Sequence, residues 1–325
     1  MRRFTAAIIG LGQIGQEYDY EYNDASLILT HANGFVHHPG FELVGAIDND
    51  ERKRKHFEKK FKKPSFSNSE TLFNVVRPEV IAIAVPTPVH LSIFQEIISY
   101  KPTAIICEKP IAANTDEAKM MIKMAEDASC AILVNYIRRF DPGVISLKKL
   151  IDAGEFGEIY KGTAWYSKGL LNNGSHFLDL LLFLLGKYQK AEIINKGRSW
   201  QGVDPEPDVK ITIGCAEIYF LSGKEEFFSL GDVELIGTKG RITYSDFGND
   251  ISFRKTIQDP MFSDYTILTK ERSPIRNDMN HYQWQVLDHL YKHLIENLPL
   301  NSNGQTALET LAIIESIFHC GGYNV

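Results

Sequence analysis

The stretch IIGLGQIG, residues 8–15, decides the fold of the first part of this chain. It ends a short apolar run and has the pattern GxGxxG, in which backbone N–H groups at a helix start can approach a pyrophosphate without obstruction by side chains. Gly10 permits the tight turn, Gly12 the close approach, and Gly15 the packing of a helix on a strand. The segment, with Gln13 and Ile14 in the same loop, predicts a dinucleotide site if it lies in a βαβ unit.

Residues 1–136 supply that context, because short apolar runs alternate with amphipathic ones. The predicted strands are Phe4–Ile9, Phe41–Asp48, Glu79–Val85, Thr103–Cys107 and Ala131–Tyr136. The predicted helices are Asp50–Phe61, Ser69–Val76, Val89–Ser99 and Thr115–Asp127, with helix starts at Ser69 and at the capping residue Asn114. Strict alternation of this kind predicts an α/β domain, a doubly wound parallel sheet covered on both faces.

Residues 137–325 have a different rhythm, since strand-like stretches follow one another and turn residues separate them. The predicted strands are Gly157–Tyr166, Ala191–Trp200, Val209–Phe220, Glu225–Ile236, Gly240–Tyr244 and Asp250–Ile257, and two closing helices are Ile275–Asn297 and Thr306–Cys320. We expect a second, α+β domain with a large, mostly antiparallel sheet.

The composition of the 325 residues is that of a globular protein, with 44% hydrophobic and 23% charged residues. The net charge of −6 speaks against a nucleic-acid partner. The basic run Arg52–Lys63 is better explained as the solvated face of a helix that buries Phe57 and Phe61. Four scattered cysteines indicate a reducing compartment. The most apolar run, Phe177–Leu185, is too short to span a bilayer, so we expect a cytoplasmic protein without membrane contact.

Asp48 is predicted to close the second strand, where a carboxylate accepts hydrogen bonds from a ribose 2′-hydroxyl. It follows the glycines later than usual because an acidic, tyrosine-rich insertion, Glu17 to about Asn33, intervenes. A carboxylate repels a 2′-phosphate, so the sequence favours NAD. The basic residues 52–54 keep NADP open as an alternative.

Two further segments follow predicted strands, at the edge where open α/β sheets bind ligands. Pro86, Thr87 and His90 follow the third strand, and Glu108 and Lys109 follow the fourth. A lysine held between a glutamate and Pro110 is positioned rather than mobile.

A third segment is GLLNNGSHFLD, residues 169–179, which reads as a loop entering a buried helix. His176 and Asp179 are three residues apart and share a helix face, so the carboxylate can orient the imidazole or cap a neighbour. Histidine near pKa 7 suits the removal of a hydroxyl proton. A nearby ammonium would lower that pKa and stabilise negative charge on oxygen.

These motifs, in this order, resemble the glucose–fructose oxidoreductase / inositol dehydrogenase / rhizopine-catabolism (Gfo/Idh/MocA) family. The resemblance rests on residues 10–15, 86–90, 108–110, 138–142 and 174–179, and it covers nearly the whole chain. It implies a Rossmann domain followed by an α+β domain whose large, open, mostly antiparallel sheet contributes to substrate binding and to a dimer contact. It also implies NAD(P)-dependent redox chemistry on a sugar, nucleotide-sugar or cyclitol hydroxyl, and a homodimer or homotetramer.

By the same resemblance, Lys109 is similar to the family lysine that contacts nicotinamide ribose and substrate, and His176 is similar to the family acid/base. Asn172 stands where inositol-dehydrogenase-like members carry Asp, and it looks more like the nucleotide-sugar branch. The side chains expected to line the substrate pocket, besides Lys109, Asn172 and His176, are Tyr136, Arg139, Tyr166, Lys168 and Asn173.

Two other functions stay open from the sequence. One is a redox-neutral enzyme that uses NAD for transient oxidation during glycoside cleavage or epimerisation. The other is a non-catalytic dinucleotide sensor on the same scaffold, against which Lys109 and His176 argue. No metal site is expected, since His289 and His293 have helical spacing but no third ligand.

Overall fold

The computed structural model describes residues 2–22 and 24–323, and the chain forms two compact units. The first unit combines Met1–Phe140 with Asn280–Glu309, and the second combines Asp141–Met279 with Thr310–Val325. The division is therefore not a single cut after residue 136, because a late segment returns to the nucleotide-binding half of the chain. Each unit is described by itself.

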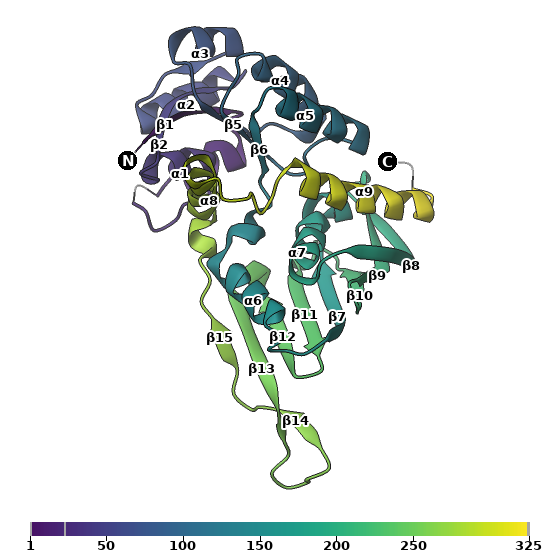
Figure 1. The fold of residues 1–325 in the computed structure, drawn as a ribbon. Coiled ribbons are helices and arrows are strands. Elements are labelled where there is room, and N and C mark those ends of the chain that lie inside the picture. Colours follow the sequence, from purple (N-terminus) through teal and green to yellow (C-terminus); the bar gives the residue numbers. More distant parts are fainter. Residues whose placement is uncertain (1, 23, 324–325) are drawn as a thin grey trace. The chain divides into compact units, whose positions relative to one another are not determined.

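The first unit contains a six-stranded sheet in the order β3-β2-β1-β4-β5-β6, and all its pairings are parallel (Figure 1). Its strands are β1 (Phe4–Ile9), β2 (Phe41–Ile47), β3 (Ser65–Phe66), β4 (Val80–Ile83), β5 (Ala104–Cys107) and β6 (Ala131–Val134). The five predicted strands are confirmed, and β3 is an additional short one. The strand order changes direction between β1 and β4, which opens a crevice at their carboxyl ends.

The helices of this unit are α1 (His31–His37), α2 (Glu51–Phe61), α3 (Ser69–Val75), α4 (His90–Ile98), α5 (Thr115–Asp127) and α8 (Tyr282–Glu296). The four predicted helices are confirmed, whereas α1 was not predicted: it begins near the end of the insertion and continues beyond it. Asn114 caps α5, as predicted, by accepting a hydrogen bond from the Glu117 N–H. α3 begins at Ser69, as predicted, and Asn68 caps it, because the Asn68 side chain accepts a hydrogen bond from the Thr71 N–H.

Both faces of this sheet are buried. Ala6 and Ile8 pack in one cluster with Phe35 of α1 and Leu287 of α8. Ala7 and Ile9 of β1, which point to the other face, are buried as well. Since successive strand residues alternate between faces, helices must cover both sides. The doubly wound α/β architecture predicted from the sequence is confirmed.

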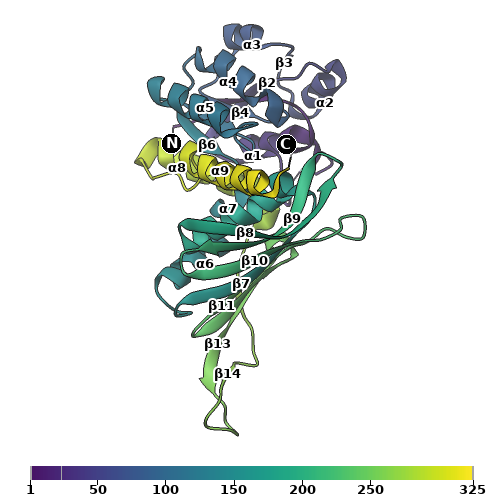
Figure 2. The same cartoon turned by 90° about the vertical axis from the view of Figure 1, so that its right-hand side faces the viewer.

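The second unit contains a nine-stranded sheet in the order β14-β13-β12-β11-β7-β10-β9-β8, with β15 paired to β13 (Figure 2). Only β7 and β10 pair in parallel, so the predicted mostly antiparallel sheet is confirmed. Its strands are β7 (Ile159–Tyr166), β8 (Tyr188–Trp200), β9 (Asp204–Ile213), β10 (Ala216–Ser222), β11 (Gly231–Gly237), β12 (Gly240–Ser245), β13 (Asp250–Gln258), β14 (Thr266–Leu268) and β15 (Ser273–Ile275).

Three predicted elements in this region are wrong in extent. Val209–Phe220 is not one strand, because a two-residue turn at 214–215 separates β9 from the antiparallel β10. The strand predicted over Glu225–Ile236 begins only at Gly231, after a loop. The helix predicted over Ile275–Asn297 begins only at Tyr282, since Ile275 ends a strand.

Helices cover one face of the second sheet, namely α6 (Pro142–Asp152), α7 (Ser175–Leu185) and the later part of α9 (Gly304–Gly321). Leu147 of α6, Leu181 of α7 and Ile314 of α9 share one apolar cluster with Ile218 of β10. On β11 and β12 buried residues alternate with half-buried ones, which is the pattern of a sheet with one open face. Among the described helices, none combines the length and apolarity that crossing a bilayer requires.

Candidate active site

The glycine loop connects β1 to a short π-turn, η1 (Gln13–Glu17). Gly10 has φ of +101°, and a Cβ there would lie 2.4 Å from the Ala84 carbonyl oxygen. A Cβ on Gly15 would lie 2.2 Å from the Gly10 carbonyl oxygen. A Cβ on Gly12 would meet no described atom within 4 Å. Gly10 and Gly15 are therefore required by the loop itself, while the open side of Gly12 leaves room for a ligand.

Asp48 follows β2 directly, is 8% exposed, and contacts the same loop. One carboxylate oxygen accepts a hydrogen bond of 2.8 Å from the Leu11 N–H, and the other accepts one of 2.8 Å from the Asp50 N–H. A carboxylate offers about four lone-pair positions, so each oxygen can accept a further bond from a ribose hydroxyl. Together with the open side of Gly12, this arrangement fits the adenosine half of NAD.

The basic residues after Asp48 are held close to the strand end. The Lys53 ammonium lies 3.9 Å from the Asp48 carboxylate, and Arg52 pairs with Asp50 at 3.0 Å. Arg54 donates a hydrogen bond of 2.7 Å to the main-chain oxygen of Asp48. The carboxylates of Asp50 and Asp48 thus offset part of the positive charge of Arg52 and Lys53, whereas Arg54 keeps its full charge because its partner is a neutral carbonyl oxygen.

The residues after β4 differ in how far they are exposed to solvent. Pro86 is exposed and Thr87 is half-buried at the start of the turn η2 (Thr87–Val89). His90 is fully buried, with Nε2 2.9 Å from the Val85 carbonyl oxygen and Nδ1 3.1 Å from the Ile111 carbonyl oxygen. This geometry supports an indirect role for His90, because its ring ties the loop after β4 to the loop after β5 and has no exposed surface for a cofactor.

Glu108, at the end of β5, belongs to a buried hydrogen-bond ring. Its Oε1 lies 2.8 Å from His31 Nε2 and accepts a bond of 2.7 Å from Asn135 Nδ2. Gln283 of α8 closes the ring, with Nε2 2.9 Å from His31 Nδ1 and Oε1 accepting from Asn135 at 3.1 Å. The sequence indicated Glu108 alone, since its partners lie in an insertion, at the end of β6 and in α8.

The electrostatics of this ring favour a charged Glu108. Burial alone would raise its pKa, but the hydrogen bond and charge of His31, with help from Asn135 and Lys109, bring the pKa below its ordinary value. The pKa of the neighbouring Tyr282 shifts in the opposite direction, because burial and, to a smaller extent, the charge of Glu108 raise it.

Lys109 follows Glu108 directly, is half-buried, and precedes a cis bond to Pro110.

The second unit contains the predicted acid/base segment. A π-turn, η4 (Gly169–Gly174), leads into α7, of which half-buried His176 is the second residue. Asp179 is fully buried and accepts a hydrogen bond of 3.1 Å from the Thr310 hydroxyl. The carboxylate is therefore engaged with α9, and His176 lies at the start of a helix that the core holds firmly.

The other predicted substrate residues fall into two groups. Tyr166 and Arg139 are buried and bound to main-chain oxygens, Tyr166 to Pro207 at 2.7 Å and Arg139 to Asn301 at 3.0 Å. Tyr136 is also buried. These three side chains are thus enclosed by the protein, and their contact with substrate stays a prediction.

Lys168, Asn172 and Asn173 are more accessible and belong to the turn before His176. The Lys168 ammonium lies 3.3 Å from Glu225, and Asn172 Nδ2 donates to the Lys168 carbonyl oxygen at 3.0 Å. Asn173 Nδ2 is buried and has no acceptor among residues 2–22 and 24–323. A buried N–H without a partner costs about 1–3 kcal/mol, so an oxygen of a ligand at this position would be favourable.

Sequence reasoning missed two acidic residues that shape this turn. Asp204 accepts hydrogen bonds from the Leu171 and Asn172 N–H groups, and Glu206 accepts one from the Gly169 N–H. Both carboxylates are buried on β9. The signal is the alternating Asp-Pro-Glu-Pro-Asp pattern of residues 204–208, which places these acids on one face of a strand.

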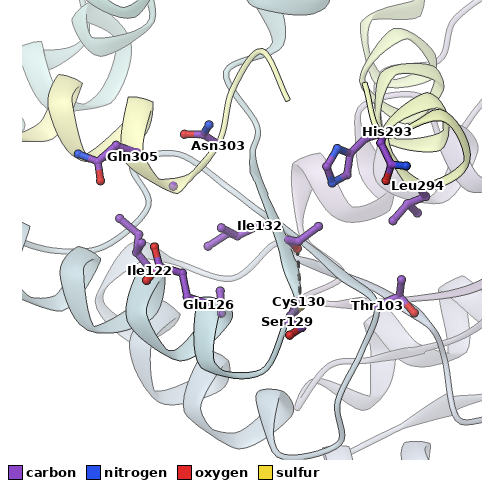
Figure 3. A pocket seen from close by; sticks show the side chains of 14 residues that line it. Thr103, Ile122, Glu126, Ser129, Cys130, Ile132, His293, Leu294, Asn303 and Gln305 are labelled. Atoms are coloured by element: carbon purple, nitrogen blue, oxygen red, sulfur yellow. Dashed lines mark hydrogen bonds between the residues drawn. The ribbon is translucent and has the colours of Figure 1, made fainter. Parts of the chain in front are cut away.

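A separate pocket of about 470 Å³ lies in the first unit (Figure 3). Thr103 precedes β5, Cys130 precedes β6 and Ala131 begins β6, so the pocket is at the amino ends of these parallel strands, opposite the edge with the glycine loop. Burial raises the pKa of Cys130 to about 12. Its other lining residues are Ile122, Ala125, Glu126, Ser129, Ile132, His293, Leu294, Asn297, Asn303, Gly304 and Gln305.

The two histidines weighed as metal ligands are engaged with nearby backbone. His289 Nε2 lies 3.1 Å from the Pro299 carbonyl oxygen, and His293 Nδ1 lies 2.7 Å from that of Leu298. Over the described part of the chain, no three His, Cys, Asp or Glu side chains gather in a metal-binding arrangement.

Similar proteins agree with this architecture. An inositol 2-dehydrogenase of Rhizobium meliloti is 31% identical over 81 residues, 25% of this chain and 24% of the relative. Another, of Rubrobacter xylanophilus, is 26% identical over 42% of this chain and 39% of the relative, so these curated relatives are matched over well under half of their length. A D-apiose dehydrogenase of Paraburkholderia graminis is 20% identical over 98% of this chain and 88% of the relative.

Solved structures share the fold of the whole chain. An aldose-aldose oxidoreductase of Caulobacter crescentus superposes with a TM-score of 0.80 at 16% identity, covering 99% of this chain and 98% of the other. The WlbA dehydrogenase of Bordetella pertussis, solved with NADH and UDP-GlcNAcA, gives 0.78 at 18% identity over 99% and 96%. Residues 4–136 match the model described as "Oxidoreductase family, NAD-binding Rossmann fold". The nucleotide-binding domain of this chain therefore belongs to the Gfo/Idh/MocA oxidoreductase family and binds NAD-type dinucleotides.

Proposed function

We propose that this protein is an NAD-dependent oxidoreductase that acts on a hydroxyl-bearing carbon of a sugar, a nucleotide sugar or a cyclitol. The observation that carries the proposal is the glycine loop, in which the side of Gly12 is open while Asp48 is bound to the Leu11 N–H. The family of the nucleotide-binding domain and the motifs around Lys109 and His176 support the reaction class.

In the proposed reaction the substrate loses a hydride from carbon and a proton from oxygen, and its C–O bond becomes a carbonyl. NAD, when bound, supplies nicotinamide C4 as the hydride acceptor. His176 takes the hydroxyl proton, since an imidazole titrates near neutral pH. Lys109 stabilises the negative charge that develops on the oxygen. Asn173 offers its buried N–H to another substrate oxygen.

The substrate proposed in more detail is a nucleotide sugar. Asn172 cannot ionise, which distinguishes this chain from the Asp-bearing pattern of inositol dehydrogenases, and its structural neighbours include an enzyme solved with UDP-GlcNAcA. Lys168, half-buried directly before the turn η4, supplies a cation for a phosphate.

The test is NADH formation against free sugars, inositols and UDP- or GDP-sugars, with substrate loss measured in parallel. We expect NADH with at least one nucleotide sugar. We expect His176→Ala to lower kcat by ~10²–10⁴-fold while the NAD affinity stays unchanged. His319→Ala, on the exposed last turn of α9, is the matched control and should keep full turnover. Unchanged turnover in His176→Ala would remove the acid/base assignment.

The same panel tests the redox-neutral alternative, because substrate loss without net NADH would indicate transient oxidation. A preparation that binds NAD but converts no substrate would indicate the sensor.

The oligomeric state is also a proposal. The open face of the second sheet favours a homodimer or homotetramer, which light scattering during size exclusion would measure.

A further inference from the structure

Two carboxylates on β9 lie against the turn η4, which directly precedes α7. Asp204 is the first of them, with 8% of its surface exposed. Its Oδ1 accepts a hydrogen bond of 3.0 Å from the Leu171 N–H, and its Oδ2 accepts one of 2.8 Å from the Asn172 N–H. One side chain thus holds two successive amides of the turn, and both of its oxygens are used.

Glu206 binds the same turn. It lies two residues further along β9, on the same face of the strand, and is 1% exposed. Its Oε1 accepts a hydrogen bond of 3.1 Å from the Gly169 N–H, while Arg198 donates one of 2.8 Å to its Oε2. Three N–H groups at the start of η4, which lack partners within a helical turn, are therefore bonded to side chains of one rigid strand.

Gly169 shows that the turn and Asp204 are fitted to each other. Its φ is +82°, and a Cβ at this position would lie 2.0 Å from Asp204 Oδ2. Residue 169 must therefore be glycine for the carboxylate to reach the amides of Leu171 and Asn172. The contact joins main-chain N–H groups of the turn to a carboxylate that is itself buried.

The consequence concerns His176. Only Ser175 separates the end of η4 from His176, so the place where α7 begins determines the direction of the imidazole. Asn173, which has a buried donor without a described acceptor, belongs to the same turn. A displacement of about 1 Å in a catalytic group can cost ~10²-fold in rate. A strand that clamps this turn would therefore control the reaction without touching the substrate.

We propose that Asp204 is a positioning residue for the acid/base: through the backbone N–H groups of Leu171 and Asn172 it fixes the turn that presents His176. This inference rests on the proposed function. In this proposal Asp204 acts through its hydrogen bonds to these two main-chain N–H groups and not by transferring a proton.

Asp204→Asn is the direct test, because it keeps the shape and turns one acceptor into a donor that faces an N–H group. We expect kcat to fall about 10- to 100-fold, with the KM for substrate and the Kd for NAD changed less than about twofold. Asp208→Asn is the matched control on the same strand. Its carboxylate binds the Ser222 N–H at 2.8 Å, in β10 and not in the turn, so kcat should stay within about twofold of wild type.

A double-mutant cycle separates positioning from general destabilisation. If Asp204 acts through His176, Asp204→Asn should lower the residual kcat of His176→Ala by less than about twofold, because the group to be positioned is gone. An additive loss, or an Asp204→Asn enzyme with wild-type kcat, overturns the inference. Wild-type kcat in His176→Ala alone overturns the proposed acid/base instead. If Asp204→Asn does not fold, Gly169→Ala, which crowds the same carboxylate, is carried through the same cycle with the same two outcomes.

Discussion

The Nε2 atom of His31 lies 2.8 Å from Oε1 of Glu108, although 77 residues separate them in the sequence. His31 is the first residue of α1, and Glu108 follows β5. The contact brings a helix from the acidic insertion to the residue that precedes Lys109. The end of the insertion therefore supports the candidate site and is not only a surface loop.

The first prediction follows from the lowered pKa of Glu108. A carboxyl group whose pKa is lower in the folded protein contributes stability above its unfolded pKa, near the ordinary value of 4.5, and loses that contribution as pH falls through the folded value. In Glu108→Gln the free energy of unfolding should therefore fall less steeply below about pH 4.5. Urea unfolding at a series of pH values measures it. Glu96→Gln, on the exposed face of α4, should keep the wild-type slope.

The second prediction separates folding from cofactor binding within the glycine loop. Gly12→Ala places its Cβ in open space, so the melting temperature should stay unchanged while NAD affinity falls about tenfold or more, equivalent to at least ~1.4 kcal/mol. Gly15→Ala places its Cβ 2.2 Å from the Gly10 carbonyl oxygen, so it should lower the melting temperature. Thermal melts and NAD titrations of both variants check this pair. Equal NAD affinity in Gly12→Ala and wild type would contradict the assignment of that side to the pyrophosphate.

The third prediction concerns the choice between NAD and NADP. Asp48→Asn keeps an oxygen for the Leu11 N–H but removes the negative charge. The ratio of kcat/KM for NADP to that for NAD should rise about tenfold or more, because the repulsion of a 2′-phosphate is lost. Asp24→Asn, an exposed residue of the insertion, removes the same charge elsewhere and should leave the ratio as in wild type. A wild-type enzyme that prefers NADP would contradict the role given to Asp48.

The fourth prediction tests His90 as a link between two loops. His90→Leu removes both ring nitrogens, which lie close to the Val85 and Ile111 carbonyl oxygens, and a buried carbonyl oxygen left without its N–H partner costs about 1–3 kcal/mol. The free energy of unfolding should fall by that order, and the KM for NAD should rise because both loops lie at the cofactor edge of the sheet. Denaturant unfolding and steady-state kinetics measure the two effects. A variant with wild-type stability would show that the ring does not hold these loops.

The sequence by itself determined the α/β alternation, the bounds of most elements in residues 1–136 and the residues of the glycine loop. These features depend on neighbours in the chain, since the period of apolar residues, a cap such as Asn114 and a glycine turn act over a few residues. It was less successful where a turn had to be located within a long apolar stretch. Val209–Phe220 contains two strands, because residues 214 and 215 form a hairpin turn that hydrophobicity does not reveal.

The tertiary structure alone decided which side chains support the candidate site. Gln283 reaches His31 across 252 residues, and Asp204 reaches Asn172 across 32. It also decided that α8 packs with β1 in the first unit, so the chain is not divided by one cut. The physical reason is that such contacts depend on how strands are ordered in a sheet and helices placed on its faces. Hydrophobic period and turn chemistry, which are local, do not encode this information.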